Sequence, residues 1–380
     1  MPKLSKHDDS LKAHAQFWAM RMALGSLMVA PRDILIPTAG KIGSTFATAK
    51  INSRGFRRAT VNLRTAFPHW TDEEIHYCAR SSYDQLLRLG VELNLGERLI
   101  TPDGWTHRVH VGNVRNELRD LIEGEPVILI TAHVGNWEVI GQTVAMLGFP
   151  MHALYRKLDL EPLDRWVRKS REKHGLTLID KFGAVDLMPD IVRKGAPVGF
   201  VADQNGGDRG VFVPFFGRLT STYKSIALLA LQFNARILCG MARRVTSSKE
   251  IEEYWPDHLR RDHNTTYRFA FEAIDSFGKE DWTTHSDPVF YICARYRRAV
   301  ETMVRRAPEQ YLWMHRIWRS RPLHERKQKP FPDSLRAKLE ELPWMESGMI
   351  EAVRDRSDRD TVLLAQSGRS RFDEPIPDPV

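Results

Sequence analysis

The chain has 380 residues, 42% of them hydrophobic and 27% charged, a composition that allows a large core and excludes a disordered chain. Its three cysteines, Cys78, Cys239 and Cys293, lie far apart without a CxxC pair, which predicts free buried thiols in a reducing compartment. The net charge of +8 favours an anionic partner, such as nucleic acid, anionic lipid or a phosphorylated substrate.

The first 115 residues are expected to be mainly helical. Residues 15–31 are the most apolar segment, but Arg21 interrupts it and Pro31 ends it, so it is shorter than the roughly 20 residues of a membrane span. This segment is expected either to lie flat in a membrane interface or to cover the core as an amphipathic helix. Further on, Thr71 followed by Glu74 is a capping-box pattern that predicts the start of a helix.

Near residue 125 the pattern changes, and short apolar runs alternate with helical stretches. Strands are expected at 126–132, 151–156, 176–180, 197–203, 235–243 and 266–274, with helices near 136–147, 161–174, 184–194, 221–234 and 284–308. This alternation predicts an α/β fold with a central mixed, mostly parallel sheet flanked by helices. The chain is then divided into an N-terminal helical or interfacial segment (1–115), an α/β domain (116–328) and a charged, partly disordered tail (329–380).

The strongest candidate for chemistry is His133, which follows the apolar run 126–132. Functional groups in α/β sheets collect at the carboxyl ends of strands. Glu138 lies in the expected first turn of the next helix, and the chain can fold back at Gly135. A carboxylate bonded to one imidazole nitrogen makes the other a general base. Taken alone, the spacing also suits a structural turn histidine and a helix-start glutamate.

A second candidate region is the glycine-rich segment 199–217. Asp203 ends a predicted strand there, and an apolar stretch with three phenylalanines follows, Phe212, Phe215 and Phe216. We expect these phenylalanines to line a pocket for a long apolar substrate or, alternatively, to cap the core.

Other motifs limit the possible functions. The chain has no GxSxG, GxGxxG or GxxxxGK[ST] sequence, which argues against a serine hydrolase, a dinucleotide enzyme and a P-loop NTPase. Residues 294–329 contain eleven Lys/Arg against three Glu, an excess as large as that of the whole chain. This basic segment favours an anionic partner, although a solvated helix face gives the same pattern.

Five stretches, in this order, resemble the bacterial lipid A biosynthesis acyltransferase family, which includes phosphatidylinositol mannoside acyltransferases. They are HVGNWE (133–138), LDRWVRKSREKHG (163–175), VGFVADQN (198–205), VPFFG (213–217) and PEQYLWMHRIWRSRP (308–322). The resemblance spans roughly residues 10–325 and implies a glycerolipid acyltransferase-like fold.

The resemblance also implies a reaction. A base formed by His133 and Glu138 would deprotonate an acceptor hydroxyl, which then attacks the thioester of acyl carrier protein or of acyl-CoA. Neither a metal nor a cofactor is implied. Four residues are expected to contact substrate or support the charge that develops: Asn136, Arg171, Asp203 and Arg316.

The implied partners are the acyl thioester donor, a glycolipid acceptor such as a lipid A precursor, and an anionic membrane surface, but no nucleic acid. The implied location is the cytoplasmic face of the inner membrane, with the protein peripheral or anchored by its N-terminus. Two departures from the family weaken parts of this picture. The N-terminal apolar segment is short, and Ile317 stands where many relatives have a second basic residue.

Alternatives remain open from the sequence. The segment from Tyr311 to His315 suits either a lipid interface, with Arg316, Arg319 and Arg321 meeting anionic headgroups, or a structural cap of the sheet. The whole chain could also be a membrane-surface protein that kept the fold and lost activity, or a nucleic-acid binder. Neither the acceptor, the acyl length nor the choice between carrier protein and CoA follows from the sequence.

Overall fold

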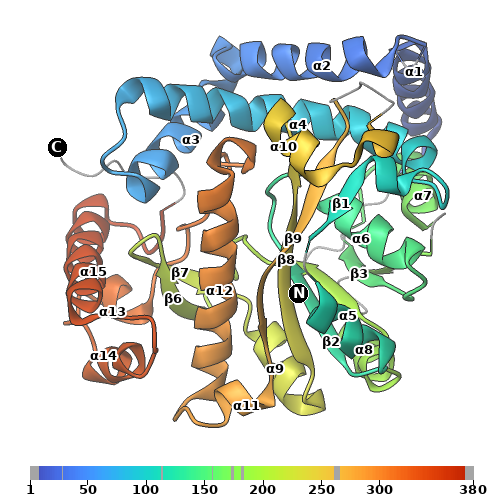
Figure 1. Cartoon of the computed structure of the whole chain (residues 1–380). Helices are drawn as coiled ribbons and strands as arrows, with labels where there is room; N and C mark the ends of the chain where they lie inside the picture. The colour runs from blue at the N-terminus through green and yellow to red at the C-terminus, as the bar shows by residue number, and fades with distance from the viewer. Residues whose placement is uncertain are drawn as a thin grey trace.

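A seven-stranded sheet forms the centre of the molecule (Figure 1). The computed structural model describes residues 8–27, 29–112, 114–155, 157–172, 175–180, 184–260 and 266–372. The strand order is β1-β9-β8-β2-β5-β3-β4, and each neighbouring pair is parallel except the antiparallel β8 and β9. The strands are β1 (Val109–Val111), β2 (Val127–Thr131), β3 (His152–Tyr155), β4 (Thr177–Asp180), β5 (Val198–Val201), β8 (Arg236–Arg244) and β9 (Phe269–Phe277). The predicted mixed, mostly parallel sheet is confirmed.

Helices cover both faces of this sheet because its strands are buried apolar runs. One core cluster joins one face to three helices, α8 (Ala184–Arg193), α9 (Lys224–Phe233) and α12 (Pro288–Arg306). On the other face lie α5 (Arg115–Ile122) and α6 (Trp137–Met146), while α7 (Glu161–Glu172) packs beside β4. Short elements complete this part: η2 (Trp105–His107), α10 (Ser248–Tyr254), η3 (Asp257–Leu259), α11 (Lys279–Trp282) and η4 (Pro308–Gln310).

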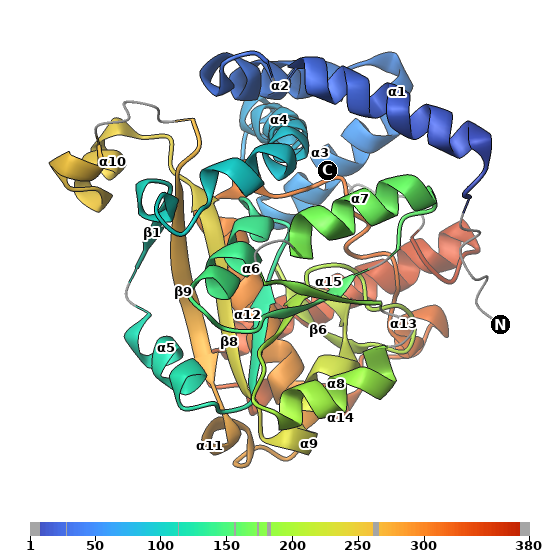
Figure 2. The ribbon, with the colours of Figure 1, turned by 90° about the vertical axis from the view of Figure 1, so that its right-hand side faces the viewer.

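The N-terminal segment is helical, as the sequence indicates. It comprises α1 (Leu11–Leu27), α2 (Arg32–Ala47), η1 (Lys50–Asn52), α3 (Ser53–Ala66) and α4 (Asp72–Leu99). The helix α4 starts with the predicted capping box, in which Thr71 and Glu74 bond reciprocally. In Figure 2, α1 and α2 form an outer layer, with α2 over α4 and α1 over α7. Among the residues that the structure describes, no helix combines the length and apolar character needed to cross a bilayer.

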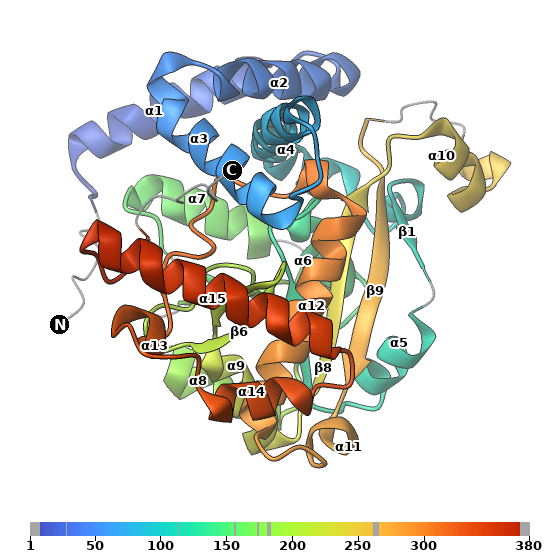
Figure 3. The same ribbon diagram turned by 90° about the vertical axis from the view of Figure 1, so that its left-hand side faces the viewer.

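Two regions differ from what the sequence predicted. The segment with the three phenylalanines forms an antiparallel hairpin, β6 (Val211–Phe215) and β7 (Arg218–Thr222). In the segment 329–380, expected to be charged and partly disordered, the described residues form α14 (Asp333–Glu340) and α15 (Ser347–Ser367), which follow α13 (Leu323–Arg326). Figure 3 shows α15 lying across α13 and the hairpin. Residues 373–380 lie outside the described part of the chain.

Candidate active site

His133 lies just beyond the end of β2, in the turn that leads into α6. Two backbone hydrogen bonds hold this turn against the segment 310–312: Leu312 N donates to His133 O (3.1 Å), and Gly135 N donates to Gln310 O (3.2 Å). Gly135 has φ +60, and an added Cβ would collide with the carbonyl of Ala242. Only glycine therefore fits this turn without strain.

The imidazole of His133 is bonded to Asp203. Their Nδ1 and Oδ1 atoms are 2.7 Å apart, and the side chain of Asp203 is fully buried. Burial alone would raise the pKa of Asp203, but the charge and hydrogen bond of His133 hold this pKa below its usual value, with smaller effects of His315 and Arg297. An ionised carboxylate only accepts hydrogen bonds. A proton of His133 is therefore assigned to Nδ1, from which it is donated to Asp203, and no residue of the described chain is seen to bond Nε2.

This arrangement follows from the strand order. The strands β2 and β5 are parallel neighbours, so His133 and Asp203, each two residues beyond its strand, meet at the same edge of the sheet.

The predicted hydrogen bond between His133 and Glu138 is not present. Glu138 does lie in the first turn of α6, but its Oε1 accepts from Arg171 Nη2 (2.5 Å) and from Trp137 Nε1 (3.1 Å). The indole of Trp137 also packs edge-to-face on the His133 ring, with centroids 4.7 Å apart. The guanidinium of Arg171 compensates the charge of Glu138, just as His133 compensates Asp203.

A further histidine, His315, contacts His133. The two ring centroids are 4.8 Å apart. Burial, together with a smaller effect of the nearby His133, lowers the pKa of His315 to about 4. His315 is thus neutral at pH 7. From the sequence, His315 was predicted only as part of a possible lipid interface, without a link to His133.

The segment around His315 is structural rather than a lipid interface. Tyr311, Leu312 and Trp313 are buried, and Asn62 donates to the carbonyls of both Trp313 and His315 at 2.8 Å. This finding corrects the interface interpretation and favours the alternative, a cap of the sheet.

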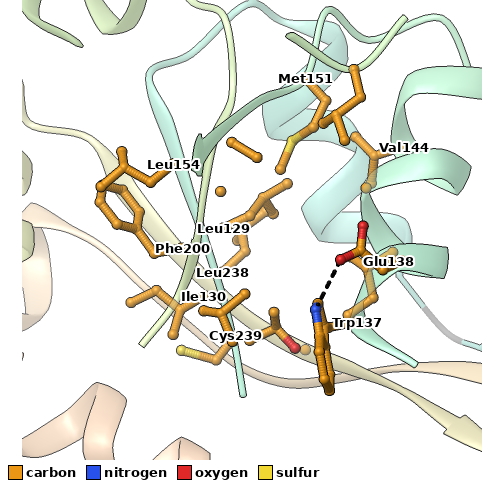
Figure 4. Close-up of a pocket in the computed structure, with 18 of the residues that line it drawn as sticks. Leu129, Ile130, Trp137, Glu138, Val144, Met151, Leu154, Phe200, Leu238 and Cys239 are labelled. Atoms are coloured by element: carbon orange, nitrogen blue, oxygen red, sulfur yellow. Dashed lines mark hydrogen bonds between the residues drawn. The ribbon is translucent and has the colours of Figure 1, made fainter. Parts of the chain in front are cut away.

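An apolar cavity of about 590 Å³ lies beside these polar groups. His133, Glu138 and Arg171 line it together with the apolar face of the sheet and α6. Figure 4 shows Glu138 and Trp137 on one side and Leu154 and Phe200 on the other. Its apolar lining comes from the strands β2, β3, β5 and β8, from the residue before β3 and from α6. The residues are Leu129, Val144, Met151, Leu154, Phe200 and Leu238, among others. A cavity of this size is in the range of a small-molecule site.

The three phenylalanines proposed for an acyl pocket do not line this cavity. Phe215 and Phe216 are buried in the core, where Arg297 lies over the Phe215 ring at 4.1 Å, and Phe212 is half-buried in β6. Pairing of β6 with β7 directs this segment toward α12 instead. The alternative, that they cap the core, describes Phe215 and Phe216.

Two other predicted substrate contacts also lie outside the cavity lining. Asn136 is buried, and its Nδ2 donates to Glu92 (2.9 Å), which in turn pairs with Arg244. Asn136 therefore ties the His133 turn to α4. Arg316 is exposed at the surface.

The three cysteines form no disulfide bond. Cys78, Cys239 and Cys293 are free and buried, as predicted. Within the described ranges, no group of three or more His, Cys, Asp or Glu is arranged to hold a metal ion.

Comparison with known proteins identifies the family of the chain. A family model described as bacterial lipid A biosynthesis acyltransferase matches residues 1–320. A lipid A biosynthesis acyltransferase of Haemophilus influenzae is 23% identical over 316 residues, which are 80% of this chain and 89% of that protein. The palmitoleoyltransferase of Escherichia coli lipid A biosynthesis is 23% identical (82% and 94% covered) and its myristoyltransferase 22% identical (81% and 89% covered). The chain therefore belongs to the bacterial lipid A biosynthesis acyltransferase family.

Proposed function

We propose that the protein transfers a fatty acyl chain from an acyl thioester, carried by acyl carrier protein or by CoA, to a hydroxyl of a glycolipid such as a lipid A precursor. The observation that carries the proposal is the His133–Asp203 pair, whose histidine lines an apolar cavity. The names of the relatives support the acceptor class and a fatty acyl donor, since two of them are a palmitoleoyltransferase and a myristoyltransferase of lipid A biosynthesis.

His133 is the general base in this proposal. The acceptor hydroxyl gives its proton to Nε2 while its oxygen attacks the carbonyl carbon of the thioester. The C–S bond of the resulting tetrahedral intermediate then breaks, and the imidazolium returns the proton to the leaving thiolate. Asp203 stabilises the imidazolium between the two steps and keeps the ring in the correct tautomer.

Arg171 provides positive charge beside this base, and Glu138 holds it in place. The Nε of Arg171 is buried and has no hydrogen-bond partner among the described residues. A guanidinium so placed suits a phosphate of the acceptor or the oxyanion of the intermediate. Glu138 thus acts on Arg171 rather than on His133. The exposed Arg316 is a candidate for the anionic groups of the acceptor or of the bilayer.

The rest of the cavity suits the acyl chain. Its lining is mostly aliphatic, so burying a hydrocarbon there is favourable by about 25 cal/mol for each Å² removed from water. We also propose that the protein is peripheral and lies on the cytoplasmic face of the inner membrane, where a substrate with such an acyl chain is available. Exposed apolar side chains on α1 and α2, such as Trp18 and Ile42, support this location.

The test is acyl transfer from labelled acyl carrier protein and acyl-CoA to total polar lipids. We expect label in a lipid with the wild-type protein, at least 100-fold less with His133→Ala, and a loss in the range of about 10²–10⁴ with Asp203→Asn. Mass spectrometry of the labelled lipid then identifies the acceptor. Full transfer by His133→Ala would refute the mechanism, and no transfer by folded wild-type protein would favour a binding protein without activity.

A further inference from the structure

The C-terminal helices lie beyond the part of the chain that the family match covers. That match ends at residue 320, and α13 to α15 follow it. Their attachment to the body is a buried cluster of charges. Asp360 on α15 is fully buried and accepts two hydrogen bonds from Arg218 of β7, at 2.7 and 2.8 Å. It also accepts one from the fully buried Arg321, at 2.7 Å.

Glu325 and Arg356 also belong to this charge cluster. Glu325 of α13 accepts two hydrogen bonds from Arg321, at 2.7 and 2.9 Å, and Arg356 Nε lies 3.5 Å from Asp360. Burial alone would raise the pKa of Asp360, but the charges of Arg218, Arg321 and Arg356 hold this pKa below its usual value. Removing one partner from such a cluster leaves an uncompensated buried charge.

The cluster continues through β7 to Asp203. Arg321 donates to the carbonyl of Leu219 (2.6 Å), fixing β7. The next residue, Thr220, accepts from Arg297 Nη2 (3.4 Å). Arg297 is fully buried, and its Nη1 donates to the carbonyls of Asp203 (2.6 Å) and Ala202 (3.2 Å). The backbone that carries the partner of His133 is therefore held by a side chain that rests on β7.

A second connection runs through the end of the described chain. Arg371 forms an antiparallel bridge with Ser320, and Phe372 N donates to Arg319 O (2.9 Å). The buried Phe372 ring lies 5.1 Å from the guanidinium carbon of Arg218. Ser320 in turn accepts from Asn205 (3.2 Å), two residues after Asp203.

We propose that Asp360 and Phe372 are positioning residues for the His133–Asp203 pair, so that the C-terminal helices are part of the machinery that orients the base. The proposal rests on the proposed function for its catalytic consequence. Both connections end on residues 202–205, and neither Asp360 nor Phe372 lines the cavity.

The tautomer of His133 reports on this positioning. Its ring faces the carboxylate of Asp203, the neutral ring of His315 and the indole of Trp137. Glu138 and Arg171 face the same cavity but pair with each other. Around Asp203 lie Arg297, the half-buried Tyr223 and the buried Tyr311. Within the described residues, Asp203 is the only carboxylate that bonds Nδ1 of His133. Moving Asp203 therefore removes the preference for the Nδ1–H tautomer.

The experiment is ¹⁵N NMR of the full-length protein labelled at histidine, with the His133 signals assigned by their loss in His133→Ala. We expect Asp360→Asn and Phe372→Ala to shift His133 away from the Nδ1–H tautomer and to lower kcat for acyl transfer by about tenfold to 100-fold. The matched control is Asp358→Asn, an exposed residue on the same helix, which we expect to leave both readouts unchanged.

The outcomes separate the two proposals. A wild-type tautomer of His133 in folded Asp360→Asn and Phe372→Ala would overturn the positioning role. If Asp360→Asn does not fold, Phe372→Ala decides, because it removes only a ring that covers the cluster. A tautomer shift in a protein whose wild type transfers no acyl chain would support the positioning role and refute the proposed function.

Discussion

His133 lies near two carboxylates, and the cations around each explain why only Asp203 bonds it. Glu138 has the guanidinium of Arg171 within hydrogen-bond distance, and a planar guanidinium binds a carboxylate more strongly than an imidazole does. Asp203 is fully buried, and His133 is the group whose side chain bonds its Oδ1. The site therefore contains two separately compensated pairs, one suited to proton transfer and one to binding an anion.

The lowered pKa of His315 predicts that the folded protein is less stable at acid pH. Its pKa in the folded protein is about 4, below the usual value of 6.5. Between these two values the unfolded chain binds a proton that the native protein does not, so stability is complete above pH 6.5 and falls as the pH is lowered. We expect the free energy of unfolding to drop by about 2 kcal/mol from this group between pH 7 and pH 5.

Urea unfolding at both pH values measures this drop in the wild type, in His315→Gln and in the exposed-site control His69→Gln. In His315→Gln, most of the drop in the free energy of unfolding that is due to His315 should be lost. In His69→Gln, the drop should be the same as in the wild type. His324, whose pKa is also lowered to about 4 by burial and by Arg321, keeps part of the slope in both variants. An identical slope in His315→Gln and the wild type would contradict the assignment.

At the scale of elements, local patterns predicted those parts of the fold that depend on local interactions. The capping box at Thr71 and the apolar run before His133 are such cases, and α4 and β2 are where they were expected. The hairpin β6–β7 was missed because Pro214 interrupts its first strand and its turn uses Phe216 and Gly217 at positive φ, without an Asn-Gly signal.

The pairing within the site depends on strand order, which single-sequence patterns do not contain. Glu138 is five residues from His133 and Asp203 is 70, so proximity in sequence favoured the wrong partner for the hydrogen bond. The adjacency of β2 and β5 reverses that choice. The resemblance to the family had already indicated Asp203 as a supporting residue, without saying what it supports.

The helix α6 forms one wall of the cavity. Its side chains are therefore expected to limit the length of the acyl chain that the cavity accepts. Glu138 is in its first turn, and Val144 lines the same cavity nearly two turns further along. Val144→Phe should fill space at that depth, so that short acyl chains are accepted as before and long ones are transferred less efficiently. We expect a change in preference of about tenfold to 200-fold per excluded methylene contact, corresponding to roughly 1–3 kcal/mol.

Competition between acyl thioesters of different length, followed by mass spectrometry of the products, measures this preference. The control is Phe215→Leu, since Phe215 is buried in the core and does not line the cavity. A shift in chain length caused by Phe215→Leu but not by Val144→Phe would restore the hairpin as the acyl pocket.

At the scale of the whole molecule, the positive charge is less concentrated on the surface than the sequence implies. Arg297 and Arg321 of the basic segment are fully buried, and Arg295 pairs with Asp275 and Asp281. The exposed apolar side chains, in contrast, gather near the N-terminus. Half of the large exposed hydrophobic residues of the described chain lie before residue 52: Leu11, Trp18, Met22, Val29, Ile34, Ile42, Phe46 and Ile51.

This distribution makes the outer layer of α1 and α2 the best candidate for contact with lipid. On α2, Ile34 and Ile42 are 60% and 57% exposed, whereas the ring of Phe46, 45% exposed, also contacts Tyr83 of α4 edge-to-face. Residues 8–58 contain eight Lys/Arg against three Asp, so an anionic bilayer suits them by charge as well. In Figure 2 the same layer lies next to α7, the helix that carries Arg171.

We expect a double variant, Ile34→Glu with Ile42→Glu, to lose binding to vesicles that contain phosphatidylglycerol, because it places two carboxylates where exposed apolar side chains would enter the interface. Flotation of the protein with such vesicles, and with vesicles of phosphatidylcholine alone, measures the effect. The matched control is Leu228→Glu, an exposed residue on α9, which lies on the opposite side of the molecule from α2 in Figure 1. Equal flotation of the double variant and the control would show that α2 does not face the membrane, whereas a loss confined to the double variant would orient the cavity and its base relative to the bilayer from which the acceptor lipid comes.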